Sequence, residues 1–286
     1  MPTFTKSNPA AEEQRPVPPL FSHSLRALVR RASQGRLVYY SRLTPYNRIF
    51  REGVPILTYH KLERPPQGVR RKDLYVRPCL FKKQMEELWK EGFCTTHLRA
   101  QKNFAQPKNN RLVITFDDGS RTVFQHAMVP LWKLGFTAIQ YLVTEHIGGR
   151  NEWDTLLGEV EDPLMDESQV RTWLSAGHKI GAHTLTHPHL TYLDRRQARE
   201  EIASSKKKLE DMFGVAVQHF CYPYGSWKVW VRDLVEEAGY KTAVTTDPGI
   251  CHTNAIDPFI LPRISVRQPP MNLRGLLDRL LSFLFL

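Results

Sequence analysis

The sequence predicts one α/β domain in which a parallel sheet closes into a barrel with helices outside it. Apolar runs of strand length alternate with amphipathic stretches of helical period between residues 54 and 266. This alternation is typical of parallel sheets covered by helices. About seven such strands can be counted, which favours a closed barrel over an open sheet. At 286 residues the chain is long enough to bury a core of that size.

The expected strands are short runs rich in branched apolar residues, bounded by polar or turn-forming residues. They span 54–60, 112–116, 137–143, 179–183, 217–222, 241–245 and 261–266. The expected helices carry apolar residues three or four positions apart, as at Phe81, Met85 and Leu88, and several end at a glycine such as Gly92. They span 77–92, 121–134, 167–176, 194–213 and 227–238.

Two short segments at expected strand ends carry most of the chemical information. Thr115-Phe116-Asp117-Asp118-Gly119-Ser120 offers two adjacent carboxylates, and His183-Thr184-Leu185-Thr186-His187 offers two imidazoles. Two His and one Asp can hold a divalent metal ion and leave a position open for water or substrate. The other Asp is then free to act as a base. The pair of segments therefore indicates a metal-dependent hydrolase.

Each segment alone has an ordinary explanation. Asp-Asp-Gly after a strand is commonly a solvated turn, and two His four residues apart are usually incidental. Together they are more informative, because sites in α/β folds gather at the carboxyl ends of the strands.

These two segments, with Tyr222-Pro223-Tyr224-Gly225, resemble the signature motifs of the polysaccharide deacetylase family, the NodB-homology group or carbohydrate esterase family four. The segment 55–60 also resembles the opening strand of many bacterial members. The similarity runs from about residue 54 to about residue 266 and keeps the family's motif order. It implies a distorted (β/α)7 barrel that removes N-acetyl groups from the amino sugars of a polysaccharide, a lipid-linked glycan or a sugar precursor.

The resemblance assigns roles to particular residues. Asp118, His183 and His187 match the metal-binding triad, whose oxygen and nitrogen donors suit Zn²⁺ and also Ni²⁺, Co²⁺ or Fe²⁺. Asp117 matches the catalytic base, which takes a proton from the attacking water.

Substrate contacts are expected after the strand 217–222. The backbone N–H of Tyr224 matches a donor of the oxyanion hole, and Trp227 is a candidate wall for sugar stacking, or else a core residue at a helix start. Trp153-Asp154 falls in a loop where related proteins place substrate contacts.

The sequence departs from the family pattern at two positions. Cys221 stands where many members carry an Arg that orients the catalytic Asp, and we expect Arg263 to take that role from another strand end. The usual late Leu-x-His, which supplies the general acid, is not evident. His60, at the end of the first strand, is the expected replacement.

The flanking segments are basic or apolar. We divide the chain into a basic, partly disordered extension over 1–50, the barrel over 51–268 and an amphipathic C-terminal helix over 269–286. The net charge is +11, which suits an anionic membrane surface, an acidic glycan or solubility alone. Both terminal segments could hold the protein at an inner membrane face, or they could cover the barrel.

Localisation is expected to be cytoplasmic. No signal-peptide pattern is seen in the sequence, and the four cysteines form no CxxC pair or disulfide framework. The positive charge alone would suit binding to nucleic acid. No recognition motif supports such binding, so no nucleic-acid partner is expected.

Two alternatives to amino-sugar deacetylation stay open. The same machinery could hydrolyse another linear amide, such as a formamide. The chain could also be a non-catalytic glycan-binding protein with a vestigial site, which the missing Arg and late His favour and the intact Asp-Asp and His pair oppose.

Overall fold

The computed structural model describes residues 47–98, 110–251 and 257–267, and within them a closed barrel of seven parallel strands. The barrel runs in the order β1-β8-β7-β6-β5-β4-β3, and β3 pairs with β1 to close it. The strands are β1 (Ile56–Tyr59), β3 (Arg111–Phe116), β4 (Ala138–Leu142), β5 (Lys179–Ala182), β6 (His219–Cys221), β7 (Thr242–Pro248) and β8 (Leu261–Ser265). The distorted (β/α)7 barrel expected from the sequence is confirmed.

The distortion lies in uneven pairing between neighbouring strands. β1 and β3 pair over four positions, from Ile56↔Val113 to Tyr59↔Phe116. By contrast, β5 and β6 share one residue pair, Ala182↔Phe220, and the β7–β8 register shifts between Val244 and Pro248. A two-residue strand, β2 (Cys94–Thr95), extends the sheet beside the start of β3. The sequence did not predict β2, because two residues show no periodicity.

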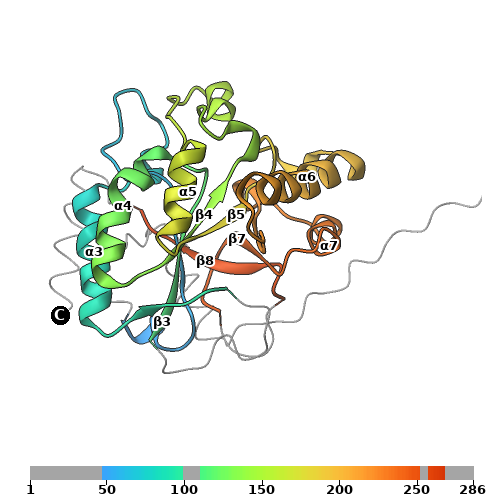
Figure 1. Ribbon diagram of the computed structural model, residues 1–286. Coiled ribbons are helices and arrows are strands. Elements are labelled where there is room, and N and C mark those ends of the chain that lie inside the picture. Colours follow the sequence, from blue (N-terminus) through green and yellow to red (C-terminus); the bar gives the residue numbers. More distant parts are fainter. Residues whose placement is uncertain (1–46, 99–109, 252–256, 268–286) are drawn as a thin grey trace, which may run out of the picture. The chain divides into compact units, whose positions relative to one another are not determined.

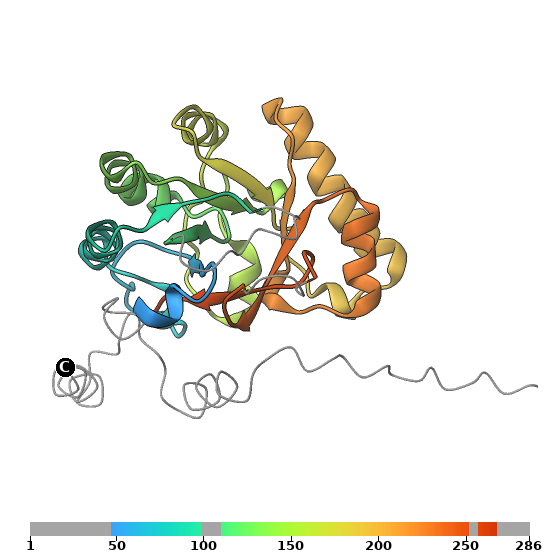
Figure 2. The same ribbon diagram turned by 90° about the horizontal axis from the view of Figure 1, so that it is seen from below.

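Five long helices cover the outside of the sheet (Figures 1 and 2). They are α3 (Pro78–Lys90), α4 (Arg121–Leu134), α5 (Glu167–Ser175), α6 (Arg195–Phe213) and α7 (Val229–Glu237). All five lie within two residues of the predicted bounds. Their ends follow the expected signals: Asp194 opens α6 with a capping box, and Gly214 ends it in the left-handed conformation.

Alternate residues of the strands face two different cores. Ile56, Val113 and Ile139 pack with one another inside the barrel, whereas Leu57 and Ile114 face the layer of helices. Every residue of β1 and β4 is buried, as expected of parallel strands covered on both faces. Burying each such Leu, Ile or Val side chain stabilises the folded protein by about 1.5–3 kcal/mol. The strand ends are therefore held in place by a well-packed core.

Short helices occupy loops beyond the strands and form much of the surroundings of the candidate site. They are η2 (Lys72–Leu74), η3 (Thr144–His146), η4 (Glu152–Leu157), η5 (Leu190–Tyr192) and η6 (Pro223–Gly225). These single turns follow no clear apolar period, so the sequence did not predict them.

The expected terminal segments lie almost entirely outside the described residues. The exception is α2 (Asn47–Phe50), whose Phe50 is buried and packs edge-on against Phe93 with ring centroids 6.1 Å apart. The expected C-terminal helix over 269–286 is not described, and the inner-membrane placement stays a prediction. None of the described helices has the length and apolar character needed to cross a bilayer.

Candidate active site

The carboxyl ends of the strands surround a cavity of about 340 Å³. Asp117 and Asp118 follow β3, His183 follows β5, and His60 follows β1. These residues line the cavity together with His187, Tyr224, Trp153 and Asp154. The two segments singled out in the sequence therefore meet at one end of the barrel, as strand-end residues of a parallel sheet should.

Three side-chain atoms of Asp118, His183 and His187 converge on one point. The two Nε2 atoms are 3.2 Å apart. Oδ1 of Asp118 lies 3.4 Å from Nε2 of His183 and 3.6 Å from Nε2 of His187. Ligand atoms held about 2.0–2.2 Å from a tetrahedral ion are themselves about 3.3–3.6 Å apart. The spacing of these three atoms therefore fits a divalent metal ion.

The hydrogen bonding of His183 prepares its ring for that role. Its Nδ1 lies 2.8 Å from the carbonyl oxygen of Cys221. Because a carbonyl only accepts, Nδ1 must carry the proton, and in the neutral ring Nε2 then presents its lone pair toward Asp118 and His187. A backbone acceptor behind a ligating His is the usual way to fix its tautomer and orientation.

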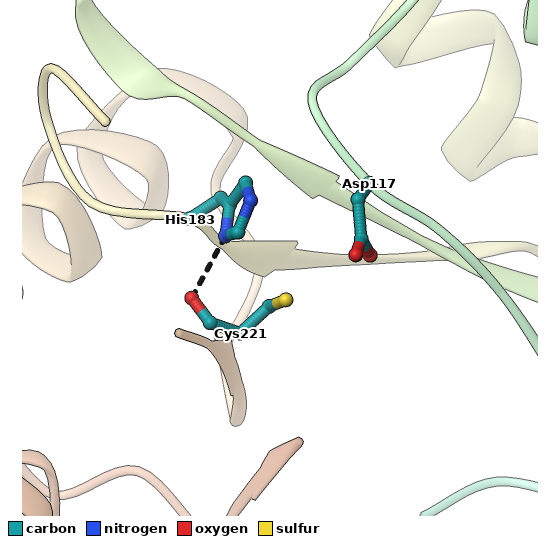
Figure 3. Close-up of side chains that lie close together, drawn as sticks. All are labelled: Asp117, His183 and Cys221. Atoms are coloured by element: carbon teal, nitrogen blue, oxygen red, sulfur yellow. Dashed lines mark hydrogen bonds between the residues drawn. The ribbon is translucent and has the colours of Figure 1, made fainter. Parts of the chain in front are cut away.

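A second group of potential ligands fits a metal less well. Asp117, His183 and Cys221 also lie close together (Figure 3). However, the Asp117 carboxylate is engaged by Arg263, and Nδ1 of His183 donates to a carbonyl. Burial raises the pKa of the Cys221 thiol, whereas a metal ligand must be a thiolate. We therefore place the candidate metal centre at Asp118, His183 and His187.

The loop that carries the two His is held by Glu201 of α6. One carboxylate oxygen of Glu201 accepts from the N–H of Leu185 at 2.8 Å and of Thr186 at 3.0 Å, and the other accepts from the Thr186 hydroxyl at 2.7 Å. The hydroxyl of Thr184 accepts from the N–H of His187 at 2.9 Å. These bonds fix a turn that is itself part of no helix or strand.

Backbone strain is concentrated in the same loops. Among the described residues, five that are not glycine have positive φ, and four of them belong to the motifs: Asp118 (70°), Thr184 (67°), His187 (65°) and Tyr224 (58°). Such conformations cost about 1–3 kcal/mol each and persist only where the surroundings enforce them. Two of the three candidate metal ligands thus sit on strained backbone, which is characteristic of functional sites.

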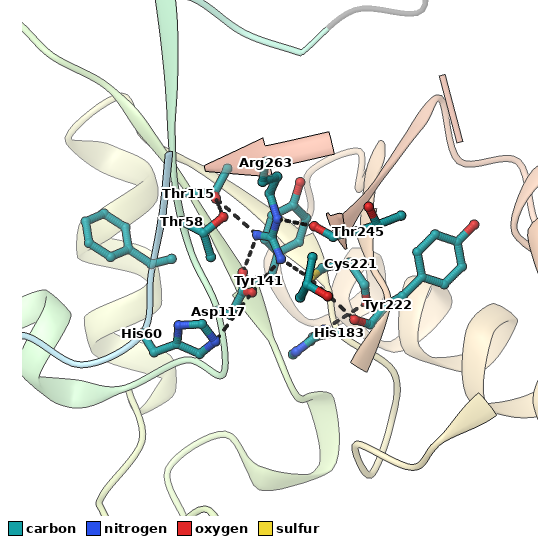
Figure 4. Close-up of polar contacts among 12 residues, drawn as sticks. Thr58, His60, Thr115, Asp117, Tyr141, His183, Cys221, Tyr222, Thr245 and Arg263 are labelled. Atoms are coloured by element: carbon teal, nitrogen blue, oxygen red, sulfur yellow. Dashed lines mark hydrogen bonds and ion pairs between the residues drawn. The ribbon is translucent and has the colours of Figure 1, made fainter. Parts of the chain in front are cut away.

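Arg263 of β8 holds Asp117 from the barrel interior (Figure 4). Its two Nη atoms donate to the two carboxylate oxygens at 2.8 and 2.7 Å. The remaining donors bond the carbonyl of Thr245 at 2.8 Å, the hydroxyl of Thr115 at 3.1 Å and the sulfur of Cys221 at 3.2 Å. The structure thus brings Arg263 beside Asp117, with Cys221 as one of its acceptors.

The electrostatics of the site keep both carboxylates ionised. Burial by itself would raise the pKa of Asp117, but the charge and hydrogen bonds of Arg263 outweigh burial and hold the pKa below its usual range. Burial acts in the same direction on Asp118. In the metal-free site a proton on Nε2 of His183 would give Asp118 a hydrogen bond, and this bond and the charges of nearby histidines hold the Asp118 pKa well below its usual range. Binding a metal ion at Nε2 would displace that proton.

His60 lies at the same mouth of the barrel as Asp117. Its Nε2 is 3.8 Å from Oδ2 of Asp117, and the side chain lines the cavity. Burial lowers the pKa of His60 from its ordinary value, against the opposing charges of Asp118 and Asp117. The ring is therefore close enough to the candidate base for both side chains to contact one group bound in the cavity.

The segment after β6 places Tyr224 at the cavity and Trp227 away from it. The Tyr224 ring packs edge-on against His187 at 4.6 Å. Gly225, at φ 69°, allows this turn, because a Cβ there would meet Thr246 Oγ1 at 1.9 Å. The indole of Trp227 instead donates to Asp247 at 3.1 Å and packs against the core. Trp227 is not among the residues that line the cavity, and its role as a stacking wall stays a prediction beside its alternative, a residue packed at the start of a helix.

Trp153 is a second aromatic residue that lies against the candidate metal ligand His187. Its ring stacks on His187, with centroids 4.7 Å apart and an interplanar angle of 29°. The sequence signal for it was only its place in a Gly-rich loop. Glu201 gave no signal at all, because it lies on the polar face of a helix and its contact is visible only in three dimensions.

Fold and site together define a parallel (β/α)7 barrel with a carboxylate–imidazole centre at the carboxyl ends of its strands. Residues 105–243 match the family model described as polysaccharide deacetylase. The chain belongs to the polysaccharide deacetylase family.

Individual relatives agree with this assignment. The chain is 30% identical over 200 residues to a Bacillus subtilis (strain 168) protein named "Putative polysaccharide deacetylase YxkH", a match that covers 68% of this chain and 65% of that relative. It is 23% identical over 156 residues to a poly-β-1,6-N-acetyl-D-glucosamine N-deacetylase of Staphylococcus aureus, covering 54% of this chain and 53% of the relative. The structure is similar to that of the Streptococcus pyogenes deacetylase PplD in complex with acetate, with a TM-score of 0.65, 25% identity and coverage of 79% and 97%.

Proposed function

We propose that this protein is a metal-dependent hydrolase that removes N-acetyl groups from the amino sugars of a polysaccharide, a lipid-linked glycan or a smaller sugar precursor. The observation that carries the proposal is the convergence of Asp118, His183 and His187 beside a carboxylate, Asp117, that Arg263 holds in place. The names of the relatives, which include deacetylases of N-acetylated glycans, support the same reaction class.

The metal centre and the base have separate carboxylates. Asp118, His183 and His187 would hold the ion, and Zn²⁺, Ni²⁺, Co²⁺ or Fe²⁺ would suit this donor set. When bound, such an ion polarises the acyl oxygen and lowers the pKa of water. Asp117 faces Arg263 and stays ionised, so its carboxylate can accept a proton from the attacking water.

Arg263 acts through Asp117 and does not need to touch the substrate. Its two parallel hydrogen bonds fix the plane of the carboxylate, as a guanidinium fork does best. This contact also argues against the vestigial-site alternative, because Arg263 of β8 would take the role of the orienting Arg that Cys221 replaces.

The remaining steps use His60 and Tyr224. Because burial lowers the pKa of His60, its ring would be neutral at rest, would receive the proton that Asp117 takes from water and would deliver it to the leaving amine. The backbone N–H of Tyr224 would donate to the oxyanion of the tetrahedral intermediate. One oxyanion donor contributes on the order of 3 kcal/mol to transition-state stabilisation. Water is consumed, the C–N bond breaks, and acetate and a free amino sugar are released.

Acetate release tests the proposal. Chitooligosaccharides, poly-β-1,6-N-acetylglucosamine and lipid-linked N-acetylamino sugars are incubated with protein that has been stripped by a chelator and then reloaded with each metal. We expect acetate from at least one glycan, only after reloading. Release of formate from N-formyl analogues, without release of acetate from any N-acetyl substrate, would favour the alternative that the protein hydrolyses another linear amide. Glycan binding without any hydrolysis by the metal-loaded protein would favour a binding protein.

A further inference from the structure

A continuous row of aromatic rings crosses the candidate metal ligand His187. Trp153 stacks on one side of its ring at 4.7 Å, and Tyr224 packs edge-on at 4.6 Å. The row continues outward at both ends. His146 packs on Trp153 at 5.1 Å, and His189 stacks on Tyr224 at 3.8 Å with an interplanar angle of 13°. His187 is therefore enclosed by rings from two different loops.

The two candidate His ligands are held in different ways. His183 donates from Nδ1 to the carbonyl of Cys221. Nδ1 of His187 is buried and has no hydrogen-bond partner among the described residues. A ligating His almost always has such a partner, and the partner orients the ring. For His187, whose backbone is also strained at φ 65°, ring packing is the contact that can take over this role.

The loop that carries Trp153 is pinned to the barrel by buried polar contacts. Lys61, the residue after His60, forms an ion pair of 2.6 Å with Asp162, and the Tyr75 hydroxyl donates to the same carboxylate at 2.7 Å. Asn151 bonds the backbone of Asp162 at the other end of the loop. Breaking a buried pair of this kind leaves an uncompensated charge. These contacts hold both ends of the 151–162 loop on the barrel, and within this loop Trp153 lies against His187.

We propose that Trp153 is a positioning residue for the metal ligand His187, in place of the hydrogen bond that Nδ1 lacks. The inference rests on the proposed metal centre. Trp153 would keep the imidazole turned so that Nε2 faces Asp118 and His183. Without the indole, the ring could rotate about its side-chain bonds, and the site would have two ordered ligands and one mobile one.

Metal affinity tests this directly, without reference to turnover. Zn²⁺ and Co²⁺ are titrated into chelator-stripped protein in competition with a chromophoric chelator. Replacing groups that orient a metal ligand typically weakens affinity by about 10–100-fold. We expect a loss in that range for Trp153→Leu and a loss under about 3-fold for Trp153→Phe, which keeps an aromatic face. Trp132→Phe is the matched control, because Trp132 is 75% exposed on α4.

Fluorescence supplies a second readout that does not depend on the Leu variant folding. Co²⁺ absorbs visible light and quenches nearby indoles, whereas Zn²⁺ does not. With Trp153 stacked on a ligand of the ion, Co²⁺ should quench the wild type and Trp132→Phe clearly more than Zn²⁺ does. Most of that difference should vanish in Trp153→Phe.

Two results would overturn the inference alone: unchanged metal affinity in folded Trp153→Leu, or a full Co²⁺ quench in Trp153→Phe. A wild-type protein that binds neither ion at this centre would overturn the inference together with the proposed metal dependence. Glycan hydrolysis with normal metal affinity in Trp153→Leu would leave the proposed function intact and remove only the positioning role.

Discussion

Arg263 and Asp117 form a fully buried, two-pronged ion pair with hydrogen bonds of 2.8 and 2.7 Å, although they lie 146 positions apart in the sequence. The pair joins β8 to the end of β3 across the barrel interior. Neither partner has another counter-charge as close among the described residues. The position of the Asp117 carboxylate therefore depends on the position of β8 in the folded barrel.

The first prediction concerns this pair. Arg263→Met should lower the free energy of unfolding at pH 7 by about 3–5 kcal/mol, since it leaves the Asp117 charge buried and uncompensated. Arg263→Lys keeps the positive charge but cannot make two parallel hydrogen bonds, so its free energy of unfolding should lie between those of the wild type and the Met variant. Urea unfolding measures both. Equal stability of all three proteins would mean that the pair does not hold the barrel together.

The second prediction separates the two adjacent carboxylates. Asp117→Asn should keep the metal and lose a factor of about 10² or more in deacetylation rate, because an amide cannot accept the proton from water. Asp118→Asn should lose the metal itself. Metal content after gel filtration and acetate release are measured on both variants. An Asp117→Asn enzyme with most of its activity would show that the base has been assigned wrongly.

The third prediction concerns Glu201, which the sequence did not reveal. Glu201→Ala removes three acceptor contacts from the His loop and should cost about 1–3 kcal/mol of stability. It should also weaken metal binding, because the turn before His187 loses its support. Glu200→Ala is a matched control, since Glu200, on the same helix, accepts a hydrogen bond from Ser204 and makes no contact with the His loop among the described residues. Similar losses of metal affinity in both variants would argue against a specific role.

The fourth prediction is a pH dependence of stability from His219. Burial lowers its pKa to about 3, against about 6.5 in an unfolded chain. Below pH 6.5 the unfolded chain binds a proton at His219 that the folded protein excludes. The free energy of unfolding is therefore unaffected by His219 above pH 6.5, and it decreases as the pH falls from 6.5 toward 3. The slope is at most about 1.4 kcal/mol per pH unit.

The test for His219 is a difference between two proteins. Asp154, whose pKa is raised to about 6 by burial and then by the charge of Asp118, acts in the opposite direction in part of this range. Unfolding free energies of the wild type and His219→Gln should therefore be compared at pH 7, 6 and 5. We expect the variant to lose less stability on acidification. Parallel curves would mean that His219 titrates normally in the folded protein.

Much of the fold followed from local patterns in the sequence. The seven strands and five long helices were predictable because each has several apolar positions at one period, as in Phe81, Met85 and Leu88 of α3. The candidate metal ligands were predictable because they cluster within two short segments. Arg263 was expected beside Asp117 only because the family pattern had a gap at Cys221.

The features that escaped prediction depend on contacts between distant segments. Trp227 and Trp153 are equally aromatic and both lie in loops near strand ends. What separates them is that Trp153 stacks on His187, in a loop whose Asp162 pairs with Lys61, whereas Trp227 donates to Asp247. Neither partner is close in sequence, so no local pattern distinguishes the two tryptophans.

The central claim is that Asp118, His183 and His187 bind one divalent ion. Anomalous diffraction at the zinc edge, from crystals grown with Zn²⁺, tests it most directly. We predict one strong peak about 2.0–2.2 Å from Oδ1 of Asp118 and from Nε2 of each His, absent from crystals of Asp118→Asn. A peak at Asp117 and Cys221 instead, or a structure in which Zn²⁺ leaves all three atoms unligated, would contradict the account.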